Sequence, residues 1–365
     1  MTDANRPSSD LDPHRRTIDA VDEQIVRLLN QRAAAAIEIG KLKEADGSPM
    51  YVPDRERRVM NKVYELNAGP LPNRAIEAIY REIISASIAL ERPLQVGYLG
   101  PAGSFSHLAA RAHFGSSVGY QGVDDIQHVF EDVDRGTLDV GLVPIENSTG
   151  GGIHDTLDCF MQSSVGICAE VLITIHHNVM CHGEFDDVRQ IASRPEIFEQ
   201  CRKWLARHAE HIERLPMSSS ARAAEQAAED PAIAAIGSTL AAELYDLPIR
   251  HANVEDNPQN VTRFFVISKI TARPTGSDKT AIMFTTAHKP GALAEVINVF
   301  ARCGINLTHI DKRPSQRVNW EYFFFIDCEG HIDEPRMTEA LEEARDHCLH
   351  LSVLGSFPKA TQVLG

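Results

Sequence analysis

The spacing of hydrophobic residues changes character twice along the chain, and this change constrains the fold more than any other feature of the sequence. The first part repeats apolar residues every three or four positions, as amphipathic helices do. The middle part alternates short apolar runs with amphipathic stretches, which predicts an α/β domain. The last part follows the order strand, helix, strand, strand, helix, strand, which is the ferredoxin-like arrangement. The sequence therefore predicts a multidomain fold, with an all-α helical domain over 1–92, an α/β domain over 94–270, a linker "TARPTGSDK" over 271–279 and an α+β domain over 280–365.

The charge balance excludes two classes of partner. The 365 residues carry a formal net charge of −15, whereas nucleic acids and anionic membrane surfaces attract basic proteins. The polar N-terminus has no apolar core of a signal peptide, and no run approaches the roughly 20 apolar residues of a membrane helix. The seven cysteines are scattered without CxxC pairs, which indicates reduced thiols. We expect a cytoplasmic protein that binds neither nucleic acid nor membrane.

Three cations lie on the apolar stripe of the first predicted helix. At 100° per residue, Arg15, Arg32 and Lys43 share a face with aliphatic side chains. A buried cation is costly unless it is paired, so these residues extend their charges to solvent, pair with buried glutamates or bind a ligand. The next two predicted helices also carry polar residues on their apolar faces, namely Arg55, Glu56, Ser87 and Glu91. Polar residues on three stripes favour a polar cavity inside a helical bundle.

The spacing of the three cations predicts an assembly. Arg32 and Lys43 lie roughly 16 Å apart along a helix, close enough for long side chains to hold one ligand from both ends. Arg15 lies roughly 25 Å from Arg32 along the same helix, too far to reach that site. We therefore predict an intertwined homodimer in which Arg15 serves the site of the partner chain. Such dimers could pair further into a higher oligomer.

The segment that holds these residues resembles the all-helical chorismate mutases. The resemblance rests on "RRTIDAVDEQIVRLLNQRAAAAIEIGKLK", "PDRER" and "REIISASIALE". It implies a pericyclic rearrangement that needs no cofactor, in which the site holds a near-attack conformer and stabilises charge on the ether oxygen. It also implies roles at the matching positions: Arg32 and Arg15 of the partner subunit for the two carboxylates, Lys43 for the ether oxygen, and Arg55, Glu56 and Ser87 for the hydroxyl and a carboxylate.

Two positions depart from the pattern of this family. Many relatives have a carboxylate where Val52 stands and a glutamine where Glu91 stands. An ionised Glu91 would repel the partly negative ether oxygen, whereas a protonated one could donate a hydrogen bond to it. We expect burial beside the substrate to keep Glu91 protonated, so that mutase activity falls as the pH rises.

The α/β domain resembles the prephenate dehydratases. The matching motifs are "GPAGSFSHLAA" (100–110), "VPIENSTGG" (143–151), "SRPEIFEQC" (193–201) and "NVTRF" (260–264). The resemblance implies two lobes around a cleft, as in periplasmic binding proteins, and loss of water and CO2 from prephenate. It implies that Thr262 donates to the departing hydroxyl and that Glu146 tunes the proton supply. The remaining implied roles are substrate orientation by Asn147, Ser193 and Gln200, and carboxylate binding by Ser104 and Arg263.

A metal site is not expected. The stretch "HHNVMCHG" (176–183) holds three histidines and one cysteine without regular ligand spacing. Neither implied reaction calls for a cofactor.

The C-terminal domain resembles the amino-acid-binding ACT domains. "HKPGALAEVINVF" and "GINLTHIDKRP" carry the resemblance, which implies phenylalanine as the effector. The implied effector residues are Gly291, Ala292, Leu293, Asn306, Leu307, Asp311, Lys312, Arg313 and Pro314. The family pattern Glu-Ser-Arg-Pro reads Asp-Lys-Arg-Pro here. A domain that only dimerises, without a ligand, is the alternative.

Together, the three resemblances indicate a bifunctional chorismate mutase/prephenate dehydratase of phenylalanine biosynthesis, with chorismate and prephenate as substrates and phenylalanine as a feedback effector. A non-catalytic two-lobed binding protein with a sensor domain is the alternative. It would explain the last two domains but not the cations on helical apolar stripes. A purely structural helical dimeriser is a third reading of the N-terminal segment, and it predicts that Arg32 can be replaced by leucine without harm.

Overall fold

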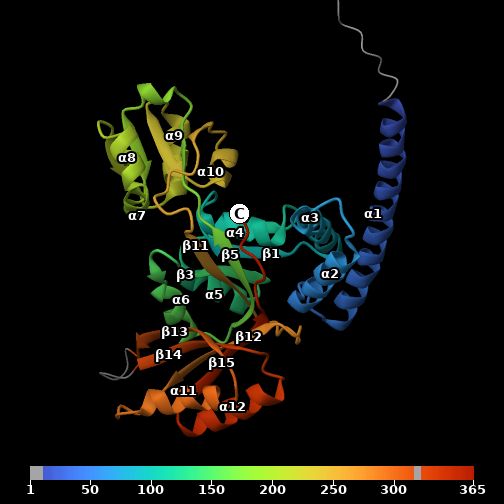
Figure 1. The fold of residues 1–365 in the computed structure, drawn as a ribbon, viewed down its shortest axis with the longest axis vertical. Helices are drawn as coiled ribbons and strands as arrows, with labels where there is room; N and C mark the ends of the chain where they lie inside the picture. The colour runs from blue at the N-terminus through green and yellow to red at the C-terminus, as the bar shows by residue number, and fades with distance from the viewer. Residues whose placement is uncertain (1–10, 316–321) are drawn as a thin grey trace, which may run out of the picture.

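The computed structural model describes residues 11–315 and 322–365, which form an arm of helices, a two-lobed middle domain and a C-terminal domain (Figure 1). The helical domain consists of α1 (Asp12–Asp46), α2 (Pro53–Leu66) and α3 (Asn73–Glu91). The C-terminal part of α1 packs against α3. Gly40 permits this crossing, because a Cβ atom at that position would lie 2.9 Å from the Cα atom of Glu91.

The N-terminal half of α1 projects away from the rest of the chain (Figure 1). Its aliphatic side chains are exposed, including Ile18 at 58%, Ile25 at 47% and Leu28 at 56%. An exposed apolar stripe of this length is unusual on a monomeric protein and marks a surface for association. None of the described helices is long and apolar enough to cross a membrane.

The first lobe of the middle domain is built on a sheet of order β2-β1-β3-β11-β5, with β4 beside β3. The chain leaves this lobe after β5 and returns to it at β11, so it crosses between the lobes twice. The elements of the lobe are β1 (Gln95–Leu99), α4 (Phe105–Phe114), β2 (Gly119–Val123), α5 (Ile126–Arg135), β3 (Val140–Asn147), β4 (Gly151–Gly152), α6 (His154–Phe160), β5 (Gly166–Thr174) and β11 (Val261–Ser268).

The second lobe has a sheet of order β10-β6-β9-β7-β8. Two of its helices begin after serines: Ser219 and Ser238 cap α9 and α10 by accepting hydrogen bonds from backbone N–H groups. The elements are β6 (Asn178–Met180), a short 3-10 helix (Phe185–Asp187), β7 (Gln190–Ser193), α7 (Pro195–Gln200), α8 (Arg202–His208), β8 (Glu213–Pro216), α9 (Ser220–Glu229), β9 (Ile233–Gly237), α10 (Thr239–Leu244) and β10 (Ile249–His251).

The C-terminal domain has the expected ferredoxin-like order of elements and a sheet of order β13-β14-β12-β15. Its sheet faces the first lobe, and its two helices lie on the outer face (Figure 1). Phe265 and Ile167 of the lobe share one hydrophobic core with Met283, Phe325 and Phe357. The elements are β12 (Asp278–Thr285), α11 (Ala292–Arg302), β13 (Leu307–Pro314), β14 (Tyr322–Glu329), α12 (Pro335–Asp346) and β15 (His350–Pro358).

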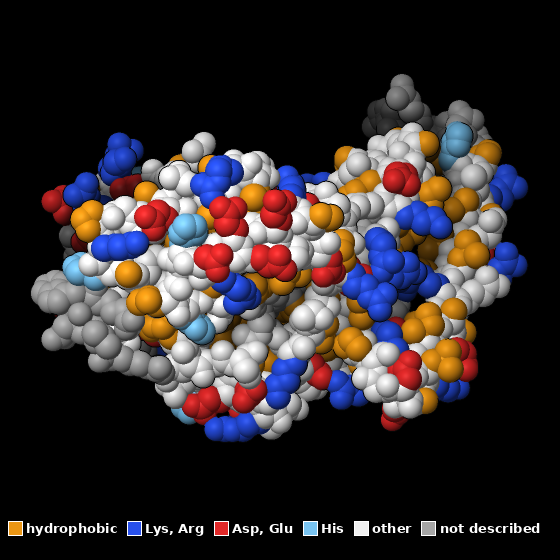
Figure 2. Space-filling model, turned by 90° about the horizontal axis from the view of Figure 1, so that it is seen from below, with side chains coloured by type: hydrophobic (Ala, Val, Ile, Leu, Met, Phe, Trp, Pro, Cys, Tyr) orange, Lys and Arg blue, Asp and Glu red, His pale blue; other side chains and the backbone are white. Residues whose placement is uncertain are grey.

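The last residues of the chain return to the other two domains. Leu364 pairs with the edge of β5, because its N–H donates to Leu172 O and its carbonyl accepts from Thr174 N, each at 2.8 Å. Seen from below, the outer helices carry many Asp and Glu side chains, while Lys and Arg gather beside a hollow on the side of the helical domain (Figure 2).

Candidate active sites

A cavity of 690 Å³ lies between the three helices and the segment of Ile270, Thr271 and Arg273 that follows β11; we call it the helical cavity. Arg32 and Lys43 enter it from α1, Arg55 and Glu56 from α2, and Ser87 and Glu91 from α3. Six of the seven polar residues predicted from the helical stripes therefore meet in one cavity. A polar cavity walled by Ala36, Ile39, Val59 and Ile84 suits a small ligand with both charged and apolar parts.

The two cations from α1 are held in place by α3. Arg32 donates to the hydroxyl of Ser87, and its guanidinium also lies 3.5 Å from the carbonyl of Ile83. The ammonium of Lys43 lies 2.8 Å from Glu91 Oε2 and 3.1 Å from the carbonyl of Met50. A ligand that binds Lys43 must therefore compete with Glu91. The expected donation from a protonated Glu91 stays a prediction.

Burial raises the pKa of Glu56 to about 7, although the nearby Arg81 and Arg57 oppose this shift. Glu56 thus changes charge close to neutral pH while it faces the cavity. Arg15, in contrast, lies outside the cavity: it is exposed and its guanidinium is 3.5 Å from Asp12. This placement agrees with the length argument that its own chain cannot use it at this site.

A second cavity, of 520 Å³, lies between the lobes of the middle domain; we call it the interlobe cavity. Thr262 and Asn147 lie side by side in it because β11 and β3 pair with these two residues in register. The Asn147 side-chain amide donates to the hydroxyl of Thr262 at 2.8 Å. Its oxygen accepts from the N–H groups of Thr149 and Gly150, at 2.9 and 2.8 Å, which fixes the orientation of the amide.

In this geometry, the stretch "PIENSTGG" orients the hydroxyl of Thr262. Asn147 occupies an acceptor position of the Thr262 oxygen, so the Thr262 O–H remains free to donate to a ligand in the cavity. The backbone N–H groups of the turn after Asn147 hold the amide that arranges this.

Two residues that sequence reasoning missed complete the network. Asn260 accepts from the Asn147 amide at 2.8 Å, and His177 Nε2 lies 2.7 Å from the side-chain oxygen of Gln200. Burial lowers the pKa of His177, so the ring is neutral and donates to Gln200 through Nε2. His177 stood in the histidine-rich stretch considered for a metal, and nothing in its spacing indicated contact with Gln200.

Cationic and backbone groups in the interlobe cavity suit an anionic ligand. Arg194 lines the cavity and is only partly engaged by the exposed Glu196, at 3.1 Å. Ser104 and Ser219 line it too, and each caps the start of a helix of ten residues, α4 and α9. Helix starts attract carboxylates through free N–H groups and the helix dipole.

Ser193 does not line the interlobe cavity, and its expected role in orienting a ligand stays a prediction. Its hydroxyl is fully buried and donates to the carbonyl of Ile236 on the neighbouring strand at 2.8 Å. Ser193 is the last residue of β7 and points into the sheet, whereas the next residue, Arg194, reaches the cavity.

Arg263 and Glu146 also lie outside the interlobe cavity, because side chains alternate across a strand. They pair in register next to Thr262 and Asn147 but point to the opposite face, toward the C-terminal domain. The Arg263 guanidinium lies 2.6 Å from Glu170 and 2.5 Å from Asp327, and Glu146 lies 3.3 Å from His309 Nδ1. Neither side chain therefore lines the interlobe cavity, and their expected roles in carboxylate binding and proton supply stay predictions.

The predicted effector residues divide between two places. Gly291, Ala292 and Leu293 form the start of α11, and Asn306 and Leu307 precede or begin β13, where Asn306 donates to Glu329 at 3.2 Å. Along β13, Lys312 and Pro314 are exposed, whereas alternate side chains face the first lobe. Arg313 makes two hydrogen bonds of 2.7 and 2.6 Å to Asp158, and Asp311 lies against Gly152. The pattern Asp-Lys-Arg-Pro at 311–314 thus contacts, through Asp311, the segment that follows Asn147.

Three protein families match the chain in order: chorismate mutase type II over residues 14–92, prephenate dehydratase over 96–272 and the ACT domain over 280–346. The bifunctional chorismate mutase/prephenate dehydratase of Aquifex aeolicus is 42% identical over 351 residues, which cover 95% of this chain and 97% of the relative. The protein of that description from Pseudomonas aeruginosa is 42% identical over 354 residues, with the same coverage of 95% and 97%. The crystal structure of prephenate dehydratase from Arthrobacter aurescens in complex with L-Phe is 31% identical, with a TM-score of 0.69, and covers 74% of this chain and 92% of that chain.

Proposed function

The chain belongs to the family of bifunctional chorismate mutase/prephenate dehydratases, and from this premise we propose how its two cavities carry out the two reactions. In the helical cavity, Arg32 binds one carboxylate of chorismate. Lys43 gives up its contact with Glu91 and donates a hydrogen bond to the ether oxygen of the substrate instead. Arg55, Glu56 and Ser87 hold the hydroxyl and the other polar groups. The rearrangement then needs only a folded substrate and a cation beside the oxygen on which charge develops. The observation that supports this site best is the convergence of two cations from α1 on α3.

Two chains together make each helical site complete. Arg15 lies outside the helical cavity of its own chain, and the aliphatic stripe of α1 around it is exposed. A partner α1 packed along this stripe would bury it and bring Arg15 of the partner subunit into reach. We infer a homodimer with two shared sites.

In the interlobe cavity, Thr262 donates to the hydroxyl that leaves prephenate. The C–C bond to the ring carboxylate breaks to release CO2, and its electrons complete the aromatic ring. The C–O electrons leave with the hydroxyl as hydroxide, which the hydrogen bond from Thr262 stabilises and which takes its proton from solvent. Arg194 and the starts of α4 and α9 hold the carboxylate that remains on the side chain, in place of Arg263. Gln200 and His177 face the ring from the second lobe.

We assign the pH dependence of the first reaction to Glu56 rather than to Glu91, because the Glu91 carboxylate is already paired with the ammonium of Lys43 at 2.8 Å. Its pKa of about 7 means that the carboxyl becomes ionised as the pH rises through neutrality, and an anion there repels a substrate with two carboxylates. We expect kcat/KM for chorismate to fall roughly tenfold from pH 6.5 to 8.5 in the wild type and to stay level in Glu56→Gln. Dehydration of added prephenate by the same samples serves as the control. An identical slope in both proteins would assign the pH effect to another group.

Phenylalanine regulates the dehydratase through the contacts between β13 and the loop of Asn147. The ACT domain and the L-Phe complex of the Arthrobacter enzyme support an amino-acid effector. Glu146, Gly152 and Asp158 lie against alternate side chains of β13, and Asp327 of β14 lies 2.5 Å from Arg263, the neighbour of Thr262. An effector that shifts β13 and β14 relative to the lobe would therefore move Asn147 and Thr262 in the interlobe cavity. Regulation of this kind is a difference in effector affinity between two arrangements of the domains.

The Asp327→Asn variant tests this route. It leaves Arg263 paired with Glu170 at 2.6 Å but removes the charge that ties Arg263 to the ACT domain. We expect calorimetry to give phenylalanine the same affinity within about threefold, while the change in dehydratase activity at saturating phenylalanine shrinks at least fivefold. Tyrosine and tryptophan are the ligand controls. Full regulation in Asp327→Asn would rule out this contact as the route, and no binding heat with any of the three would leave the ACT domain a dimerising role only.

The seven cysteines are free thiols, which supports a reducing compartment such as the cytoplasm.

A further inference from the structure

The first turn of α2 is held by two segments that do not belong to the helical domain. Asp54 Oδ1 accepts from the backbone N–H of Arg273 at 3.2 Å. Arg57 donates to the hydroxyl of Thr361 at 2.8 Å and to the carbonyl of Lys359. Arg273 lies in the linker that leads into β12 and Thr361 follows β15, so these segments flank the ACT domain, and we call them its two ends.

The two residues between these anchors are Arg55 and Glu56, which line the helical cavity. Part of the cavity wall is formed by residues outside the helical domain, namely Ile270, Thr271 and Arg273. A shift of either end of the ACT domain would therefore move the first turn of α2 and the wall beside it together.

The contact at Asp54 has the character of a specific anchor. Its side chain is only 2% exposed, and the cation beside it, Arg58 at 2.7 Å, is 57% exposed. A buried carboxylate is costly unless its oxygens are satisfied, and here one oxygen takes the N–H of Arg273 while the other takes Arg58. A carboxylate on an exposed helix turn is satisfied by water and does not require two protein donors.

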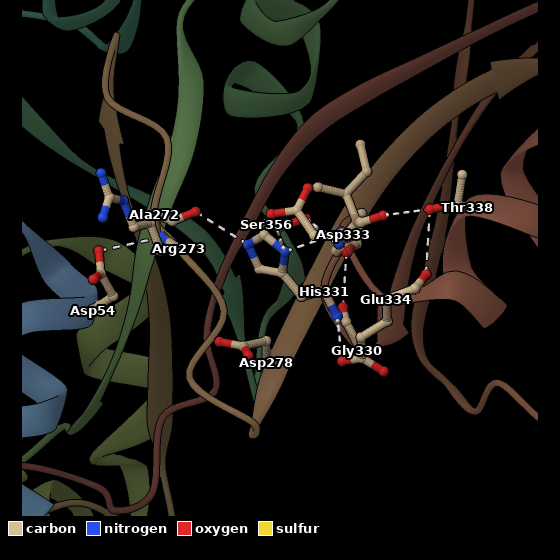
Figure 3. A network of polar contacts seen from close by, with 12 residues as sticks. Asp54, Ala272, Arg273, Asp278, Gly330, His331, Asp333, Glu334, Thr338 and Ser356 are labelled. Carbon is tan, nitrogen blue, oxygen red and sulfur yellow. Dashed lines mark hydrogen bonds and ion pairs between the residues drawn. The ribbon is translucent and has the colours of Figure 1, made fainter.

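The linker that supplies this N–H is fixed in turn by the ACT domain (Figure 3). The carbonyl of Ala272, next to Arg273, accepts from His331 Nε2 at 3.1 Å. His331 is buried, and its Nδ1 accepts from the N–H of Asp333 at 3.1 Å while its Nε2 donates to Ala272 O. Figure 3 shows this chain of contacts running from Asp54 through the linker to His331.

We propose that Asp54 and Arg57 are positioning residues for the mutase reaction, which fasten the first turn of α2 to both ends of the ACT domain and so set where Arg55 and Glu56 point. The geometry of the mutase site thus depends on the two segments that flank the ACT domain. The inference rests on the proposed roles of Arg55 and Glu56 in the helical cavity.

Substitutions in the full-length chain test the proposal, because each sample reports two reactions. Asp54→Ala and Arg57→Ala should each lower kcat for chorismate roughly 10- to 100-fold, since small displacements of positioning groups have effects of this size. KM should change less than threefold, and dehydration of added prephenate should stay within twofold. Lys62→Ala removes an exposed cation from the same helix and should change neither reaction.

Conservative and remote variants separate positioning from general loss of structure. Asp54→Asn keeps an oxygen that accepts the N–H of Arg273 and should recover most of the lost kcat. His331→Gln, whose amide can donate to Ala272 O, should keep mutase activity, whereas His331→Leu should lower its kcat at least threefold although it lies in another domain. Unchanged mutase kcat in Asp54→Ala and Arg57→Ala, or an equal loss of both reactions, would overturn the proposal. Arg55→Ala separates a failure of this proposal from a failure of the proposed mutase site. If Arg55→Ala retains full mutase activity, the proposed site itself is wrong.

Discussion

Replacing Thr262 with alanine should abolish the dehydratase reaction and leave the mutase reaction intact. Thr262 carries the hydroxyl in the interlobe cavity whose proton Asn147 leaves free, so its loss removes the donor to the departing hydroxyl. Loss of a proton donor in the transition state lowers kcat by roughly 10²- to 10⁴-fold. Because the helical cavity lies in another domain, Thr262→Ala supplied with chorismate should accumulate prephenate at the wild-type rate.

The matched control is Thr262→Ser, which keeps the hydroxyl and should retain dehydratase activity within about tenfold. Thr262 is only 8% exposed, so its substitution could also disturb β11. Intact mutase activity and an unchanged unfolding temperature show that Thr262→Ala is folded. A kcat for prephenate close to that of the wild type in this variant would remove Thr262 from the chemistry.

Arg15→Ala and Arg32→Ala should each lose mutase activity, and mixing the two chains should restore part of it. Each substitution removes a cation that binds a substrate carboxylate, for which we expect roughly a 10²- to 10³-fold loss of kcat/KM. If sites are shared, a mixed dimer has one site with both arginines and one with neither. Random mixing of equal amounts makes half of the dimers mixed, so about a quarter of the wild-type activity should return.

Arg16→Ala is the control for a change on the exposed part of α1, because within residues 11–315 and 322–365 the Arg16 guanidinium has a single hydrogen bond, to the carbonyl of Asp12 in its own helix at 3.3 Å. It should keep full activity alone. Mixed Arg15→Ala and Arg32→Ala chains that stay inactive after subunit exchange would show that each site is built from a single chain.

The helical cavity could be predicted because one helix fixes the direction of its own side chains. The 100° rotation per residue places Arg32 and Lys43 on one face, and it placed Ser87 and Glu91 on the facing stripe of α3. The same periodicity could not reveal the contact at Asp54. That residue is a neighbour of cavity residues in the sequence, but its partner, Arg273, lies 219 positions further along the chain.

The interlobe site was predicted less well, because a motif does not say which face of a strand meets the ligand. Thr262 and Arg263 are adjacent in "NVTRF", and Asn147 and Glu146 are adjacent in "PIENS". In each pair, one side chain enters the cavity and the other enters the interface with the ACT domain. Only the position of β13 and β14 against the lobe shows that Arg263 and Glu146 have partners there.

The most direct test of the account is to give the purified wild-type chain chorismate alone and to follow both products over time. The account predicts that prephenate appears first and that phenylpyruvate follows without any other enzyme, each at the rate set by its own cavity. Chorismate that stays unchanged, or prephenate that accumulates without ever yielding phenylpyruvate, would contradict the claim that this one chain houses both catalysts.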